Sequence, residues 1–160
     1  MLIRPLVESD WSRVAAIEAA TYRDLGLSEG PAALRSRAGA GTSFVLEADE
    51  VVVGYVLALP YPYGRIPDLA APGPIPARVA DLHLHDMAVA AEYRRAGLGT
   101  RLAGHLLTVA RDLGYERVSL VALDGRAAFW GRQRFARQPS VPAPDGYGPG
   151  ATYMSLRFDD

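Results

Sequence analysis

The sequence predicts an α/β (α+β) fold, in which a mixed β-sheet is flanked by helices. The chain has 160 residues, of which 49% are hydrophobic, which suits one domain over residues 1–160 with its own core. Short segments with strand-like patterns alternate with longer segments that carry apolar residues at helical spacing. Their order is β-α-α-β-β-β-α-β-α-β-β, and this order is typical of a mixed sheet with helices packed on it.

The first half of the chain predicts three strands and two helices. Pro5 suits an edge strand, and Asp49 with Glu50 suits the turn of a β-hairpin. Ser9 or Asp10 is the expected cap of the first helix. We expect strands over 2–7, 42–48 and 51–59, and helices from the cap to about Tyr22 and over 31–37.

The second half predicts four strands and two helices. Gly97 precedes a segment with a leucine stripe at helical spacing, and Gly114 is a typical helix end. Residues 117–123 are strongly apolar, as in a strand that is buried on both faces. We expect strands over 81–89, 117–123, 134–138 and 152–158, and helices over 97–113 and 126–133.

Residues 60–78 contain six prolines and two tyrosines. Proline neither continues a helix nor donates to a central strand, so this segment is predicted to be a loop. A long loop in a compact domain is often functional. A lid over a substrate and an inert loop remain equally good interpretations.

Composition excludes several classes of function. Cysteine is absent, which removes disulfides, thiolate metal sites and an acyl-cysteine intermediate. The net charge of −1 favours neither nucleic acid nor an anionic membrane. No apolar run of roughly 18 residues and no signal peptide are apparent. Because cysteine is absent, we expect a cytoplasmic protein. All seventeen basic residues are Arg, which indicates a bacterial, GC-rich genome.

A glycine-rich turn precedes the helix predicted from residue 97. A helix N-terminus presents unpaired N–H groups, and glycine lets a ligand approach the backbone closely. With Arg94 and Arg95 nearby, Gly97 and Gly99 predict a pyrophosphate site. A dinucleotide-binding fingerprint would need glycine where Leu102 stands, and a P-loop would need Lys. A plain tight turn is the alternative.

These residues resemble the GNAT superfamily of N-acetyltransferases. Its hallmark is a strand with Ala-Val followed by Arg/Gln-x-x-Gly-x-Gly/Ala, and this chain has Ala88-Val89 and then Arg94-x-x-Gly97-x-Gly99. The resemblance implies the GNAT fold, a mostly antiparallel mixed sheet with about four helices. It also implies an N-acetyltransferase that uses acetyl-CoA and no metal. Phe129-Trp130 with Phe135 also matches the family pattern, and Ile3-Arg4-Pro5 with Asp10 matches it more loosely.

The resemblance implies a set of cofactor-binding residues. The backbone of the strand should pair with the pantetheine arm of acetyl-CoA, one amide should hold the thioester oxygen, and the turn should wrap the pyrophosphate. An aromatic side chain should pack against the cofactor. These residues are Met87, Ala88 and Val89 on the strand, Arg94, Arg95, Ala96, Gly97, Leu98, Gly99 and Thr100 in the turn, and Trp130.

The chain departs from the family pattern near its last helix. Asp124 stands in the region where the family often has Asn, and Arg134 replaces a usual Gly. Trp130 replaces the Tyr that often protonates the departing thiolate. Other tyrosines are candidates for this acid, and the sequence does not choose among Tyr22, Tyr61, Tyr63 and Tyr147.

His83 and His85 are the candidate catalytic residues. At i and i+2 on a strand they should share one face and line one cavity, with Asp86 on the other face. A histidine titrates near neutral pH and suits removal of a proton from an amine. The string His-Leu-His-x-x-Ala-Val resembles the arylalkylamine (serotonin) N-acetyltransferases, in which such a pair is thought to pass the proton out through water. Structural histidines are the alternative, and no third residue completes a metal site.

The predicted function is acetyl transfer to a primary amine by direct attack in a ternary complex. We expect a small-molecule acceptor, with no nucleic acid or membrane as partner, and family members are commonly homodimers. The alternatives are a peptide or protein acceptor and a catalytically weak acyl-CoA-binding module. A nucleotide-binding regulator is the remaining interpretation of the glycine turn.

Overall fold

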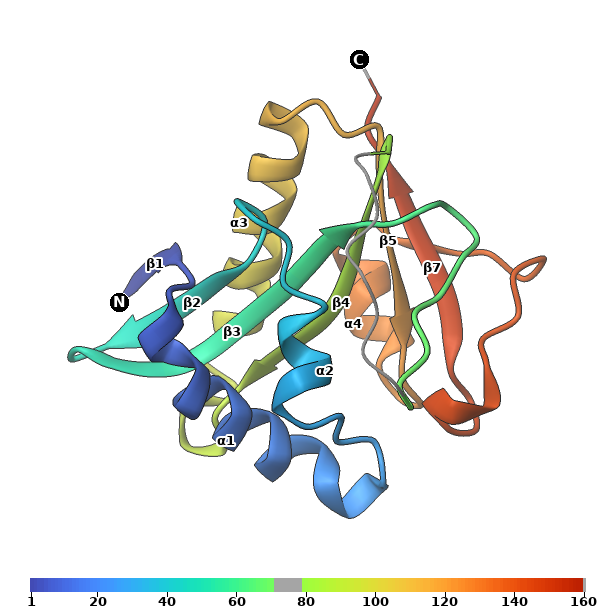
Figure 1. The fold of residues 1–160 in the computed structure, drawn as a ribbon. Coiled ribbons are helices and arrows are strands. Elements are labelled where there is room, and N and C mark those ends of the chain that lie inside the picture. The colour runs from blue at the N-terminus through green and yellow to red at the C-terminus, as the bar shows by residue number, and fades with distance from the viewer. Residues whose placement is uncertain (71–78, 160) are drawn as a thin grey trace.

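The computed structural model describes residues 1–70 and 79–159, in which seven strands form one mixed sheet (Figure 1). The strand order is β1-β2-β3-β4-β5-β7-β6. Neighbouring strands are antiparallel except β4 and β5, which run parallel. The strands are β1 (Leu2–Pro5), β2 (Phe44–Ala48), β3 (Val51–Pro60), β4 (Asp81–Val89), β5 (Arg117–Ala122), β6 (Ala136–Arg137) and β7 (Thr152–Arg157).

Four α-helices in the described part of the chain cover the two faces of this sheet (Figure 1). The first two pack on one face around Val14, Leu34 and Tyr55, and the other two pack on the opposite face around Leu84 and Leu102. The predicted fold class and element order are therefore confirmed. The helices are α1 (Trp11–Tyr22), α2 (Pro31–Arg35), α3 (Leu98–Asp112) and α4 (Ala127–Arg132), with 3₁₀ turns at Glu8–Asp10, Arg23–Leu25, Ala91–Tyr93 and Asp145–Tyr147.

The predicted boundaries differ from the observed ones at a few places. The strand expected over 134–138 is reduced to β6, because Arg134 adopts a left-handed φ of 76° after α4 and cannot extend the strand. Of the proline-rich loop, residues 71–78 lie outside the described residues. Tyr147 donates a hydrogen bond to the carbonyl of Pro67 at 2.5 Å, so the described part of this loop is attached to the body of the protein.

Strands β4 and β5 pair over a short distance and then separate. Their parallel register covers only Asp81 with Arg117, Leu82 with Val118, and His83 with Ser119. Strand β3 stays paired with β4 as far as Val89. From Leu84 onward, β4 therefore has a strand partner on one edge only.

A β-bulge interrupts β4 at His85. Leu57 of β3 pairs with Asp86, whereas the next residue, Ala58, pairs with Leu84, so His85 is the extra residue. The bulge reverses the alternation of side chains along the strand. Asp86 consequently contacts Tyr22 of α1, on the same side as His85. The expectation that Asp86 faces away from the histidines is wrong, because it assumed a regular strand.

Helix α1 begins at the predicted N-cap, Asp10, but the carboxylate does not cap the helix. It accepts two hydrogen bonds of 2.8 Å from the Arg4 guanidinium and one of 2.8 Å from the Val7 N–H. The hydrogen bond from Arg4 is the main cause that lowers the pKa of Asp10 below 3.8. Asp10 thus ties α1 to β1.

Replacing this carboxylate should destabilise the protein in a pH-dependent way. At pH 7, Asp10→Asn is expected to lower the free energy of unfolding by about 2 kcal/mol. Because the pKa of Asp10 is lowered on folding, its contribution is present above pH 3.8 and disappears as the pH falls through the folded-state value. Urea unfolding between pH 7 and pH 2.5 measures this, with the exposed Asp24→Asn as control. An equal loss at both pH values would contradict the assignment.

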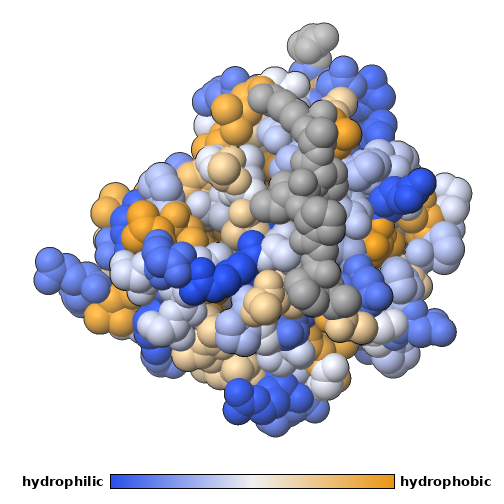
Figure 2. All heavy atoms as spheres, in the orientation of Figure 1, coloured by the Kyte–Doolittle hydropathy of each residue, from blue (hydrophilic) through white to orange (hydrophobic). Residues whose placement is uncertain are grey.

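The surface adds little to the argument about function. No helix in the described ranges is both long enough and apolar enough to span a bilayer. On the face seen in Figure 2, apolar residues form small separate groups between polar ones.

Candidate active site

A cavity of about 760 Å³ lies where β4 and β5 separate. Its wall is formed by the end of α1 and the loop after it, by β4 beyond the bulge and the end of β5, and by α4 and the start of α3. The sequence-predicted residues that line it are His85, Met87, Ala88, Val89, Arg94, Arg95, Gly97, Leu98, Gly99, Thr100 and Trp130. His83 and Ala96 do not line it.

The unpaired edge of β4 presents backbone groups to this cavity. The Ala90 N–H donates to the Val53 carbonyl of β3 at 2.8 Å. The backbone N–H and C=O groups of successive residues point to alternate edges of a strand in an antiparallel pair. Those of Ala88 therefore also point to β3, whereas those of Met87 and Val89 point to the open edge. Arg94 Nε donates to the Val89 carbonyl at 2.8 Å. The N–H groups of Met87 and Val89 are thus directed toward the gap between the strands.

The start of α3 forms the second part of the wall. Gly97 is its N-cap with φ of 75°, and Arg95 has φ of 68°. The Arg101 N–H donates to the Gly97 carbonyl at 3.1 Å, so the N–H groups of the three residues before it have no partner within the helix. This geometry is suited to an anion such as pyrophosphate.

Aromatic residues of α4 complete the wall near this end. Trp130 is buried and packs edge-on against Phe129, with ring centroids 4.9 Å apart, and against Phe135, at 5.5 Å. Gly99 of α3 lies close to Phe129, and a Cβ on this glycine would be 3.6 Å from the Phe129 ring, at ordinary van der Waals distance. Trp130 therefore stands in a packed aromatic cluster whose edge reaches the cavity.

The two predicted catalytic histidines have different surroundings. His83 is only 1% exposed, and burial, followed by the charges of His85 and Arg37, holds its pKa well below 6.5. His83 is therefore neutral and away from the cavity. The expectation that both imidazoles line one cavity is wrong for His83, because this part of β4 is covered on both faces.

His85 lies in the cavity wall and is bonded to a carboxylate. Its Nε2 is 2.5 Å from Oε1 of Glu29, and the Glu29 side chain is only 4% exposed. Within the described residues, Nδ1 of His85 is buried without a hydrogen-bond partner. When the imidazole is neutral, the carboxylate partner places its proton on Nε2, because a carboxylate only accepts hydrogen bonds, and Nδ1 then has the free lone pair.

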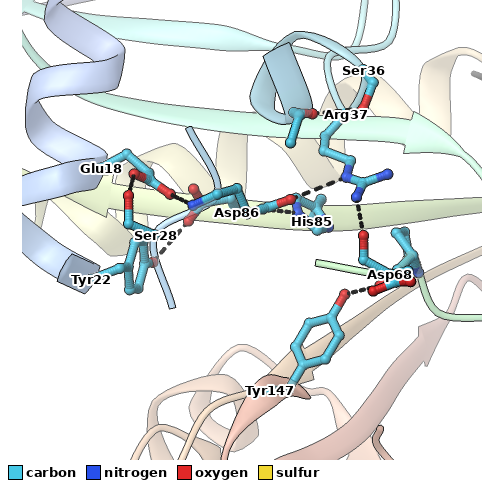
Figure 3. Close-up of polar contacts among 12 residues, drawn as sticks. Glu18, Tyr22, Ser28, Ser36, Arg37, Asp68, His85, Asp86 and Tyr147 are labelled. Carbon is cyan, nitrogen blue, oxygen red and sulfur yellow. Dashed lines mark hydrogen bonds and ion pairs between the residues drawn. The ribbon is translucent and has the colours of Figure 1, made fainter. Parts of the chain in front are cut away.

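Glu29 is held in place by a network of polar contacts (Figure 3). Arg37 Nε donates to its other carboxylate oxygen at 3.3 Å, and the same guanidinium donates to the Asp68 carbonyl. The Glu29 N–H donates to buried Glu18 of α1 at 2.8 Å, and the Ser28 hydroxyl donates to Glu18 at 2.6 Å. These contacts fix the loop between α1 and α2 and, with it, the orientation of His85.

Asp86 is the other carboxyl group beside the bulge. It is 8% exposed, and its two oxygens accept hydrogen bonds from the Tyr22 hydroxyl at 2.8 Å and the Tyr55 hydroxyl at 2.7 Å. Burial raises the pKa of Asp86 to about 6. This position of Asp86 was not predicted from the sequence, because regular alternation places Asp86 on the other face of the strand.

Metal binding receives no support from the described residues. No three His, Asp or Glu side chains there gather as metal ligands. Asp81, at the start of β4, accepts a hydrogen bond from the Ser119 hydroxyl at 2.9 Å.

Comparison with known proteins shows the family of this chain. The acetyltransferase (GNAT) family model matches residues 11–135. The chain therefore belongs to the GNAT acetyltransferase family, and it is an acyltransferase that uses acetyl-CoA. No curated protein sequence matches the chain.

Several solved structures have the same fold. Ard1 from Thermoplasma volcanium has a TM-score of 0.74 at 20% identity, covering 99% of this chain and 98% of that one. The ribosomal-protein-S18-alanine N-acetyltransferase from Escherichia coli has a TM-score of 0.70 at 19% identity, and the match covers 98% of this chain and 92% of that one. A GNAT family acetyltransferase from Brucella melitensis in complex with acetyl-CoA has a TM-score of 0.70 at 21% identity, and the match covers 99% of this chain and 88% of that one. These likenesses show the fold, and they do not support the finer resemblance to serotonin N-acetyltransferases.

Proposed function

We propose that this chain, acting as one domain over residues 1–160, acetylates a small primary amine by direct attack in a ternary complex. The observation that carries the proposal is the buried His85–Glu29 pair in the cavity wall, two residues before the backbone edge at Met87. A base next to a thioester site is what amine acetylation requires, because the amine arrives protonated.

His85 acts as the base and Glu29 as its positioning residue. Glu29 accepts the Nε2 proton, and the free Nδ1 of His85 takes a proton from the ammonium group of the acceptor. The carboxylate also stabilises the imidazolium that results. His83, predicted to share this role, is assigned none in proton transfer, because its pKa is held well below 6.5 by burial and by nearby charges.

The backbone edge of β4 and the start of α3 bind acetyl-CoA in this proposal. Pantetheine pairs with the open edge at Met87 and Val89 as an added strand, and the Met87 N–H stabilises the negative charge that develops on the thioester oxygen. The N–H groups from Gly97 to Thr100 hold the pyrophosphate, with charge from Arg95. Trp130 packs against the cofactor. Arg94 donates to the Val89 carbonyl at the end of this open edge.

The acceptor end of the cavity favours a cationic amine. Two buried carboxyl groups, Glu18 and Glu29, contribute to its wall, and they favour an ammonium ion over a neutral or anionic acceptor. A peptide N-terminus is the second candidate, because the solved structures with this fold include ribosomal-protein-alanine N-acetyltransferases.

The test is CoA release from acetyl-CoA with a panel of acceptors. The panel contains arylalkylamines, aliphatic monoamines, polyamines, aminoglycosides, amino acids and short peptides that begin with alanine. Saturable turnover with one class of small amine is the expected result. Turnover with peptides alone would replace the small-molecule acceptor by a protein, and silence across the panel would contradict the proposed function.

A further inference from the structure

We propose that Tyr22 and Asp86 form a proton-transfer pair that delivers a proton to the departing sulfur of CoA. This inference rests on the proposed function, in that it places the thioester at the open edge of β4. It assigns the acid that the Tyr-to-Trp130 replacement leaves unfilled.

Position favours Tyr22 among the tyrosines. Its hydroxyl lies 2.8 Å from Asp86 and 3.3 Å from the carbonyl of Met87, which points to the same open edge as the Met87 N–H. Of the four candidates only Tyr22 and Tyr147 line the cavity. Tyr147 donates its proton to the Pro67 carbonyl at 2.5 Å, whereas the partner of Tyr22 is a carboxyl group that can itself hold a proton.

The surroundings of Asp86 suit a proton donor. Tyr55 of β3, His85 of β4, and Tyr22 and Glu18 of α1 face it, and Arg126 adds positive charge near Tyr22. Burial raises the pKa of Asp86 most, the two tyrosine hydroxyls and the His85 charge lower it, and Glu18 raises it. A ligand in the cavity covers the remaining exposed surface, which favours the protonated carboxyl group further.

The proton balance of the step is simple. As the C–S bond breaks, its electron pair moves to sulfur, and sulfur takes the phenolic proton of Tyr22. When Asp86 is protonated, its O–H donates to the Tyr22 oxygen in place of accepting from it. The Tyr22 oxygen therefore takes the carboxyl proton of Asp86, which becomes a carboxylate and regains its proton from solvent. A free thiol has a pKa of about 8.5, above the value of about 6 for Asp86, so the overall transfer is downhill. Tyr22 itself remains protonated between turnovers, because burial and the Asp86 charge raise its pKa well above 10.

A ligand pair that differs only at sulfur tests this coupling without turnover. The carboxyl carbon of Asp86 is titrated by ¹³C NMR in the full chain, saturated with CoA or with desulfo-CoA. In the CoA complex Tyr22 turns part of its hydrogen bond toward sulfur, so the pKa of Asp86 is expected to be about one unit higher than with desulfo-CoA. In Tyr22→Phe the difference should vanish. Equal titration of the wild-type protein with both ligands would overturn the proposal.

Kinetics provide the second test. Tyr22→Phe is expected to slow CoA release from acetyl-CoA at least about tenfold, both with an amine and with water as acceptor, since thiolate departure is common to both. Tyr115→Phe, a buried tyrosine outside the cavity wall, is the matched control and should keep the wild-type rate. A wild-type rate in Tyr22→Phe would overturn the proposal. If the wild-type protein releases CoA no faster with amines than with water, the proposed function fails instead, and the water reaction and the titration still decide on Tyr22.

Discussion

His85→Gln is expected to lower kcat for amine acetylation at pH 7 by about 100-fold or more, with KM for acetyl-CoA nearly unchanged. Glutamine keeps a hydrogen bond to Glu29 and nearly the same volume, but it cannot accept a proton. The ammonium form of the acceptor then persists in the site. Steady-state kinetics with an amine identified from the panel measure the effect, and raising the pH should restore part of the rate because more amine is already neutral.

Glu29→Gln separates positioning from base catalysis in the same pair. The amide still meets His85 Nε2, 2.5 Å away in the native protein, but it no longer offsets the imidazolium charge, so kcat should fall less than in His85→Gln. His105→Gln is the matched control, because His105 packs against Phe44 with ring centroids 4.6 Å apart and lies outside the cavity wall. An unchanged kcat for His85→Gln across the pH range would contradict the role of His85 as base.

Gly97→Val is expected to weaken CoA binding by at least about 100-fold. The left-handed backbone conformation costs a residue that has a side chain about 1–2 kcal/mol, and it costs a β-branched residue more. The valine variant should therefore not keep the φ of 75° that Gly97 has. Among the described residues, apart from the chain neighbours of Gly97, no atom lies within 4 Å of a Cβ added there. The cause is therefore a rearranged first turn of α3, which no longer directs its N–H groups at the pyrophosphate, and not a clash within the protein. Isothermal titration with CoA measures the loss.

Gly104→Val makes the same chemical change seven residues later in α3. Gly104 has no atom within 4 Å of an added Cβ and no left-handed φ, so this variant should bind CoA as the wild type does. Circular dichroism shows whether both variants keep the fold. If folded Gly97→Val bound CoA with native affinity, the pyrophosphate site would have to lie elsewhere.

Much of the fold is local, and the sequence by itself determined it. The hairpin turn at Asp49 and Glu50 appears where expected, and both residues are left-handed, with φ of 51° and 64°. Strand β4 has the predicted bounds, Asp81–Val89. Helix α3 begins after the predicted glycine turn. Alternation, helical spacing and turn residues depend on neighbours within a few positions, so a single sequence contains these signals.

The composition of the candidate site was decided only by the tertiary structure. Glu29 lies 56 residues from His85, and no periodicity connects a loop after α1 with a strand so far along the chain. The bulge at His85 was equally hidden, because it arises from the register between β3 and β4. One inserted residue turned Asp86 toward Tyr22, and the burial of β4 separated His83 from the cavity. Side-chain direction and burial depend on how strands pair and what covers them, and these are properties of the packed molecule.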